Sequence, residues 1–321
     1  MRSARFTQGL HDLGRGLYAW LQPDGSWGWS NAGLIVDGDQ SLLVDTLFDE
    51  PLTARMLAAM QDATGIAPDS IPLLVNTHAN GDHTHGNALV PNAEVIASAA
   101  AAREMAELPP ALVAQLMAGA NAGALGPAGE MLREVFGPFD LASARGRAPT
   151  RSFEASLVVR VGDKTVELRK LGPAHTAGDI VVHVPGDRAL FTGDILFVEV
   201  TPIMWAGPVG NWLAACDWIL TLDVDHIVPG HGPPADKSDV RRLQEYLRHV
   251  DREARQRYES GMDALEAAQD IALGDFRHWL DAERIVANVM ALYREYAGDS
   301  SPPDVIGVFH AMSRVRRQLR G

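Results

Sequence analysis

The 321 residues are enough to bury a large core, either as one domain or as one domain with an appendage. A hydrophobic content of 46% and a charged content of 21% are those of an ordinary soluble globular protein. The net charge of −13 argues against nucleic acid as a partner, because phosphate binding needs clustered Lys and Arg.

The chain shows no targeting or disulfide signal. Residues 1–8 lack the apolar core of a secretion signal, and no run of about 18 apolar residues occurs. Cys216 is the single cysteine, so a disulfide framework is excluded, and it lies on an apolar helical stripe. We therefore expect a cytoplasmic protein without a membrane partner, with Cys216 as a small buried residue and not a nucleophile.

The first hundred residues alternate between strand and helix patterns. Short apolar runs with Gly and Asp turns predict strands at 17–21, 32–36, 41–45, 71–75 and 94–97. A helical spacing of apolar residues ending at Gly65 predicts a helix over 51–64. This order suits half of a layered α/β sandwich.

Residues 100–150 interrupt that rhythm. Short helices are predicted at 100–108, 111–117 and 129–135, with an Ala/Gly-rich stretch between the last two. The segment carries no metal-ligand pattern, so it is either a lid over a site or a spacer. We favour the lid.

Strands return at 157–161, 165–168, 180–184 and 189–191, and helical patterns follow at 239–268, 276–296 and 304–320. The helical C-terminal third can shape a substrate pocket or a homo-oligomer interface. Its last turns hold Arg314, Arg316, Arg317 and Arg320, which we expect to form a solvated basic end.

One loop concentrates metal-ligand side chains. Directly after the apolar run 71–75 come His78, Asn80, Asp82, His83 and His85. Imidazole and carboxylate groups hold Zn²⁺ and similar ions, and ligands two and four residues apart can converge from one tight loop. A buried strand ending there would present these ligands at the edge of a sheet.

Three later segments repeat the same device of a short strand, a Gly-containing turn and one ligand side chain. They place His175 after a strand-like run, Asp194 at the end of an apolar strand, and His231 after the run 226–228.

This order of residues resembles the metallo-β-lactamase fold superfamily, whose pattern is His-x-His-x-Asp-His, then His, Asp and Pro-Gly-His. The resemblance covers about the first 235 residues. It implies an α/β fold, namely a four-layer αββα sandwich with a one- or two-metal site along one edge. We accordingly expect a metallo-β-lactamase-like domain over 1–237 with a helical insert at about 100–150, and an all-helical C-terminal extension over 238–321.

The resemblance also implies the ligand roles. The first metal would be held by His78 and His175, and the second by Asp82, His83 and His231, with Asp194 bridging both. The implied cofactor is zinc, as one or two ions.

Asn80 departs from the family pattern, which usually has His at that position. A neutral amide oxygen is a weaker donor to zinc, which leaves Mn²⁺ or Fe²⁺ open at the first site. We expect His85 to point away from the metals, and Asp45 and Thr77 to orient the ligands.

The predicted activity is a metal-dependent hydrolase that directs a metal-activated water at an ester, thioester, lactone or lactam. No nucleophile elbow, P-loop or dinucleotide-binding motif competes with this hypothesis. Asp82 is the predicted catalytic residue, since it would orient the attacking water. The apolar segment 197–208 predicts an apolar small-molecule substrate, contacted by Phe197 and Trp205.

Two alternatives stay open. The same site could serve a non-hydrolytic metalloenzyme of this fold, resembling a sulfur dioxygenase or a polyketide cyclase. The fold could also be retained for non-catalytic binding or assembly through the C-terminal helices.

Overall fold

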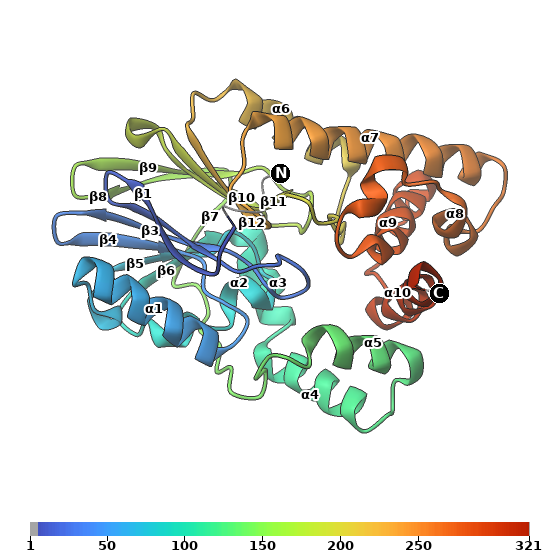
Figure 1. Ribbon diagram of the computed structural model, residues 1–321, viewed down its shortest axis with the longest axis horizontal. Coiled ribbons are helices and arrows are strands. Elements are labelled where there is room, and N and C mark those ends of the chain that lie inside the picture. Colours follow the sequence, from blue (N-terminus) through green and yellow to red (C-terminus); the bar gives the residue numbers. More distant parts are fainter. Residues whose placement is uncertain (1–5, 321) are drawn as a thin grey trace.

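The computed structural model describes residues 6–320 and contains two β-sheets that pack face to face (Figure 1). The first sheet has seven strands in chain order: β1 (Gly9–Gly14), β2 (Leu17–Leu21), β3 (Ala32–Asp37), β4 (Gln40–Val44), β5 (Leu73–Val75), β6 (Glu94–Ser98) and β7 (Arg151–Phe153). The second runs β12 (His226–His231), β11 (Ala189–Phe197), β10 (Ile180–Val184), β9 (Lys164–Lys170) and β8 (Ser156–Val161).

A dry core lies between the sheets. Leu42 and Val75 of the first sheet belong to the same buried cluster as Leu168, Val182 and Phe191 of the second. These residues alternate with others that face outward, because successive side chains of a strand point to opposite faces. Gly33 permits the close approach of the sheets, since a Cβ there would lie 2.2 Å from the Phe191 ring.

Helices cover both outer faces. Helix α1 (Glu50–Thr64) lies against the first sheet, and α6 (Val209–Thr221) with α7 (Lys237–Glu259) covers the second (Figure 1). The Asp49 side chain caps α1 by accepting the Leu52 N–H at 2.7 Å. The predicted four-layer αββα sandwich is thus confirmed.

The insert and the C-terminal extension are helical, as expected, and they meet. The insert contains α3 (Ala99–Glu107), α4 (Pro110–Asn121) and α5 (Gly126–Phe136). The extension contains α7, α8 (Ala264–Asp270), α9 (Ile285–Ala297) and α10 (Val305–Arg320). Helix α5 packs against α10, so the two regions form one wall of the molecule (Figure 1).

Several boundaries differ from the sequence prediction. The pattern at 239–268 is two helices, because Gly261 adopts a φ of +81° and Asp263 caps α8. Strands β1 and β7 were not predicted, since both carry little apolar sequence and β7 has only three residues. Five residues separate β5 from α2 (Gly81–Thr84), which makes a single turn within the His-rich loop.

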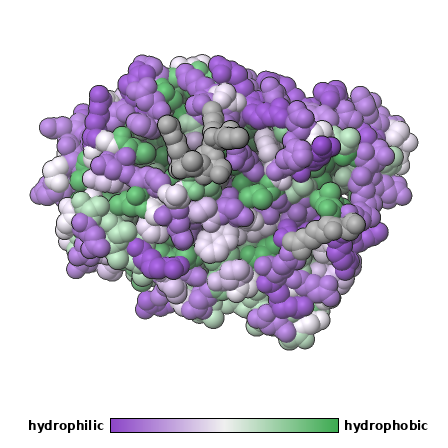
Figure 2. Space-filling view, viewed as in Figure 1, coloured by the Kyte–Doolittle hydropathy of each residue, from purple (hydrophilic) through white to green (hydrophobic). Residues whose placement is uncertain are grey.

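The face drawn in Figure 2 is mostly hydrophilic, with small scattered hydrophobic patches. Within residues 6–320, no helix is long and apolar enough to cross a membrane. Residues 1–5, from which we expected no secretion signal, lie outside the described residues, as does the side chain of Arg320.

Candidate metal centre

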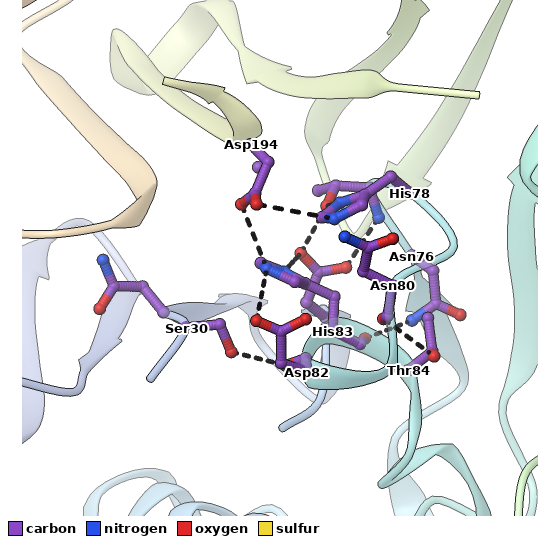
Figure 3. Close-up of polar contacts among 12 residues, drawn as sticks. Ser30, Asn76, His78, Asn80, Asp82, His83, Thr84 and Asp194 are labelled. Carbon is purple, nitrogen blue, oxygen red and sulfur yellow. Dashed lines mark hydrogen bonds and ion pairs between the residues drawn. The ribbon is translucent and has the colours of Figure 1, made fainter. Parts of the chain in front are cut away.

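Six predicted ligands converge at one edge of the sandwich. Two groups of side chains have ligand atoms within 4.8 Å of one another: His78, His175 and Asp194 form the first, and Asp82, His83 and His231 form the second. We call these six residues the His/Asp cluster. Figure 3 shows Asp194 reaching from the opposite strand toward His78 and His83.

Strand ends bring these residues together. His78 follows β5, Asp82 and His83 lie on α2, and Asp194 lies in β11. Strand β12 runs parallel to β11 and ends on His231, opposite Phe197. Gly230 is required at this crossing, because a Cβ there would lie 1.9 Å from Oδ1 of Asp194.

Each imidazole of the cluster is held by its Nδ1 atom. Nδ1 lies 3.0 Å from the Thr77 hydroxyl in His78 and 2.9 Å from Asp45 Oδ2 in His83. In His175 and His231 it lies 2.6 Å and 2.9 Å from the backbone carbonyls of Ile203 and Gly25. Such contacts fix the ring orientation and turn Nε2 towards the centre of the cluster, which is the usual arrangement around metal-binding histidines.

The free donor atoms fit a divalent metal. Nε2 of His78, Nε2 of His83 and Oδ1 of Asp194 are buried and make no hydrogen bond with any residue of the described chain. Unpartnered buried polar atoms are costly, so several of them facing one another mark a place for a ligand. Imidazole nitrogen with carboxylate oxygen is the donor set that zinc and related ions accept.

Asp194 lies between the two groups. Its Oδ2 is 3.3 Å from Nε2 of His175, and its Oδ1 is 3.2 Å from Nε2 of His83. Oδ2 is also 3.5 Å from Nε2 of His231. One carboxylate thus contacts imidazoles of both groups, as the bridging role implied by the family resemblance requires.

Burial and charge set the protonation of the cluster. Burial lowers the pKa of His78 well below its ordinary value, and the neighbouring His83 lowers it further. Burial also lowers the pKa of His83, but Asp194, Asp45 and Asp82 together outweigh it and raise that pKa well above the ordinary value. For Asp194, burial raises the pKa, but the surrounding imidazoles outweigh it and hold the pKa well below the usual range. Its carboxylate is therefore ionised at neutral pH.

Asn80 stands beside the first group. Its amide Nδ2 lies 2.9 Å from Nε2 of His175, the atom that would bind an ion. Rotating the amide by half a turn would place Oδ1 there instead. The structure therefore puts Asn80 where the family pattern has its additional His.

Asp45 and Thr77 take the orienting positions that we expected. Both carboxylate oxygens of Asp45 accept hydrogen bonds from Thr77, at 2.7 Å from its backbone N–H and 2.7 Å from its hydroxyl. Since Asp45 also contacts His83, one buried carboxylate ties the rings of His78 and His83 to the end of β4.

Three other predicted residues lie elsewhere. His85 belongs to neither group of the cluster: its ring packs over Gly81 and 5.5 Å from the Phe48 ring, and burial lowers its pKa to about 4. Phe197 is 1% exposed and stacks on the His231 ring at 5.2 Å, so it lies beneath the cluster and not on an open substrate wall. Trp205 lines a separate cavity next to the C-terminal helices.

The segment 281–284 of the C-terminal extension braces His231 and was not predicted. The Arg284 guanidinium lies 4.1 Å from the Trp27 ring centroid and 5.8 Å from that of Phe197, which itself stacks on His231. Arg284 is 2% exposed and pairs with Asp281 at 3.1 Å. Asp281 accepts the Ser26 hydroxyl at 2.9 Å, next to Gly25, whose carbonyl holds His231.

The fold and the His/Asp cluster match those of one superfamily, and the sequence comparison agrees. The family model of the metallo-beta-lactamase superfamily matches residues 25–231. The chain belongs to this superfamily.

Three proteins to which the chain is similar share less than a quarter of its residues over the matched length. A "Beta-lactamase-like protein 2 homolog" from Caenorhabditis elegans is 24% identical over 220 residues, which are 68% of this chain and 61% of that protein. The stereoselective inverting sec-alkylsulfatase Pisa1 from Pseudomonas sp. has a similar structure, with a TM-score of 0.68, 17% identity, and coverage of 93% of this chain and 52% of that one. The chain therefore spans between half and two thirds of the length of these relatives.

A metallo-beta-lactamase from Pontibacter korlensis gives a TM-score of 0.56 at 17% identity and covers 75% of this chain and 99% of that one. The likeness to Pisa1 is thus broader than the family domain. It includes residues beyond 231, where the family model ends. Family model and structural neighbours together show the metallo-beta-lactamase fold.

Proposed function

We propose that the protein is a metal-dependent hydrolase of a small carboxyl derivative: an ester, thioester, lactone or lactam. The observation that carries the proposal is the His/Asp cluster, with four anchored imidazoles and two carboxylates around unpartnered donor atoms. The reaction does not need Cys216, which is fully buried and whose pKa burial raises to about 12.

Zinc is the proposed cofactor, with His78, Asn80, His175 and Asp194 holding one ion and Asp82, His83, His231 and Asp194 holding a second. Such ions supply Lewis acidity and lower the pKa of water towards neutrality. Mn²⁺ or Fe²⁺ at the Asn80 site remains the alternative, because an amide oxygen is a harder donor than imidazole.

Asp82 is the proposed catalytic residue. Its side chain is 14% exposed, more than that of any other cluster member, so it faces the side from which substrate arrives. Burial raises its pKa, but His83 and His231 outweigh that effect and hold the pKa below the usual range. Its Oδ2 lies 3.3 Å from Nε2 of His231, and the ionised carboxylate can accept a hydrogen bond from the attacking water and orient it.

A sulfate ester is the second candidate substrate. The structural likeness to an alkylsulfatase covers 93% of this chain, including helices beyond the family domain. A sulfate ester and a carboxyl ester both place an oxygen where a metal can polarise it, so the fold serves either reaction.

The test is elemental analysis of protein purified without added metal, followed by turnover of ester, thioester, lactone, lactam and alkyl sulfate substrates. We expect one or two equivalents of zinc and hydrolysis of at least one carboxyl derivative, both lost in His83→Ala. Turnover of persulfide with iron bound would support a dioxygenase instead. If the protein is purified without metal and stays inactive on the whole panel after zinc is supplied, the proposal is overturned and a binding or assembly role is favoured.

A further inference from the structure

A cavity in the C-terminal extension has no part in the metal centre described above. It has a volume of about 490 Å³, within the range of small-molecule sites. Helices α9 and α10 form most of its wall, through Ala287, Met290, Ala291 and Val308. Alanine leaves space beside a helix and methionine adapts its shape, so the wall suits an apolar ligand.

The charged groups of this cavity are already paired. Nε of Arg294 lies 3.6 Å from Asp299, and Asp299 also accepts the Ser301 N–H at 2.9 Å. Asp304 accepts the Gly307 N–H at 2.9 Å. Because none of these groups needs a charged partner from a ligand, the cavity favours a neutral occupant.

The cavity adjoins the metal centre through one short segment. Met204 and Trp205 line the cavity, and the Trp205 N–H donates to the backbone carbonyl of His175 at 2.9 Å. The preceding residue in this segment, Ile203, holds the His175 ring through its carbonyl. A ligand against Trp205 therefore touches the segment that positions a proposed metal ligand.

Aromatic side chains continue from the cavity towards the cluster. The Trp205 ring lies 6.4 Å from Phe309, and Phe309 lies 5.5 Å from Trp27. Trp27 belongs to the loop whose Gly25 carbonyl holds His231. Trp27 and Phe309 are buried, so these rings are packed core that joins the cavity wall to the loop holding His231.

We propose that this cavity binds the neutral alkyl or acyl chain of the substrate whose reacting group lies at the His/Asp cluster. The inference rests on the proposed hydrolase function and adds to it a substrate class, namely long-chain esters or thioesters. It also assigns the C-terminal extension a role in substrate selection.

The first test compares a short-chain and a long-chain ester on the zinc-loaded protein. We expect kcat/KM for a p-nitrophenyl dodecanoate to exceed that for the acetate. Ala291→Phe fills the cavity and should lower the dodecanoate to acetate ratio by about 10-fold or more, since several methylene groups lose their burial. Acetate hydrolysis should stay within about twofold of wild type. Ala291→Leu should give a smaller loss, and Ala54→Phe, an exposed site on α1, should give none.

A second test does not require turnover. Calorimetric titration of metal-free protein with decanol should show one binding site in wild type and in Ala54→Phe, and greatly weakened binding in Ala291→Phe. Equal decanol binding by wild type and Ala291→Phe, or an unchanged chain-length ratio, would overturn the inference while leaving the hydrolase intact. Inactivity on both esters and on the thioester, lactone and lactam substrates, combined with decanol binding lost in Ala291→Phe, would overturn the proposed function and keep the apolar site.

Discussion

The ligand loops at the sheet edge and the segment 281–284 both lie around His231, but they differ in how far their buried polar groups have partners. In the loops, donor atoms of His78, His83 and Asp194 are buried without hydrogen-bond partners. In the segment, Asp281 and Arg284 pair with each other and with neighbouring groups, and only Nε of Arg284 has no hydrogen-bond partner within the described residues. Unpaired donors mark a place for a ligand, whereas paired ions mark a structural joint.

The largest effect on zinc binding should come from removing a donor atom from the ligand loops. His83→Ala deletes an imidazole that contacts Asp45, Asp82 and Asp194, so we expect zinc affinity to fall by more than about 100-fold and turnover to be lost. The metal-free protein should keep its fold, but its unfolding midpoint should fall, because the buried carboxylates of Asp45 and Asp194 lose a partner. Metal titration and thermal unfolding measure the two effects.

The matched control is His85→Ala, two residues further along the same loop and outside both ligand groups. It should keep the metal stoichiometry of wild type. If His85→Ala lost metal as completely as His83→Ala, the division of the loop into ligands and neighbours would be wrong.

The next largest effect is expected on stability, from loss of the ion pair in segment 281–284. Arg284→Met removes the nearer of the two guanidinium groups that pair with the buried Asp281, at 3.1 Å against 3.8 Å for Arg316, so we expect the free energy of unfolding to fall by about 3 kcal/mol. Arg284→Met combined with Asp281→Asn should regain part of that loss, because the uncompensated charge is gone. Denaturant unfolding of the metal-free variants makes the measurement.

Zinc affinity distinguishes the segment 281–284, which supports His231, from the residues that would bind the metal. Arg284 reaches His231 only indirectly, through Phe197 and through Asp281 and the 25–27 loop, so its loss should weaken zinc binding by about 10-fold, well short of the effect of His83→Ala. An Arg284→Met protein with normal stability would show that this ion pair does not hold segment 281–284 in place beside His231.

These two regions also differ in how far the sequence predicted them. The ligand loops follow a local pattern, in which each strand ends on one donor residue, and residues far apart in sequence meet because the strand ends share an edge. The joint has no such pattern. Arg316 was expected to be solvated, but its side chain is 16% exposed and pairs with Glu283 and with Glu134 of the insert. That interpretation was wrong, because the packing of α5 against α10 is not visible in either helix alone.

Asn80→His tests whether residue 80 belongs to the first metal site. The Asn80 amide lies 2.9 Å from Nε2 of His175, so an imidazole at this position would add a stronger donor to the first group. We expect zinc affinity at that site to rise by roughly 10-fold and the metal stoichiometry to approach two. Unchanged stoichiometry, measured by elemental analysis after dialysis, would contradict the assignment of Asn80 to the first site.

The smallest expected effect is on the labelling rate of the Cys216 thiol. This rate distinguishes local opening of the structure from global unfolding. It lies on α6, apart from both regions, and burial raises its pKa to about 12. At pH 8 the folded thiol is then ionised in only about one molecule in 10⁴, so labelling should be at least about 1,000-fold slower than in urea. In Arg284→Met, labelling should accelerate only in proportion to the population of unfolded protein. Faster labelling than the unfolding equilibrium allows would mean that α6 opens locally when the joint is lost, and that segment 281–284 supports the second sheet as well as His231.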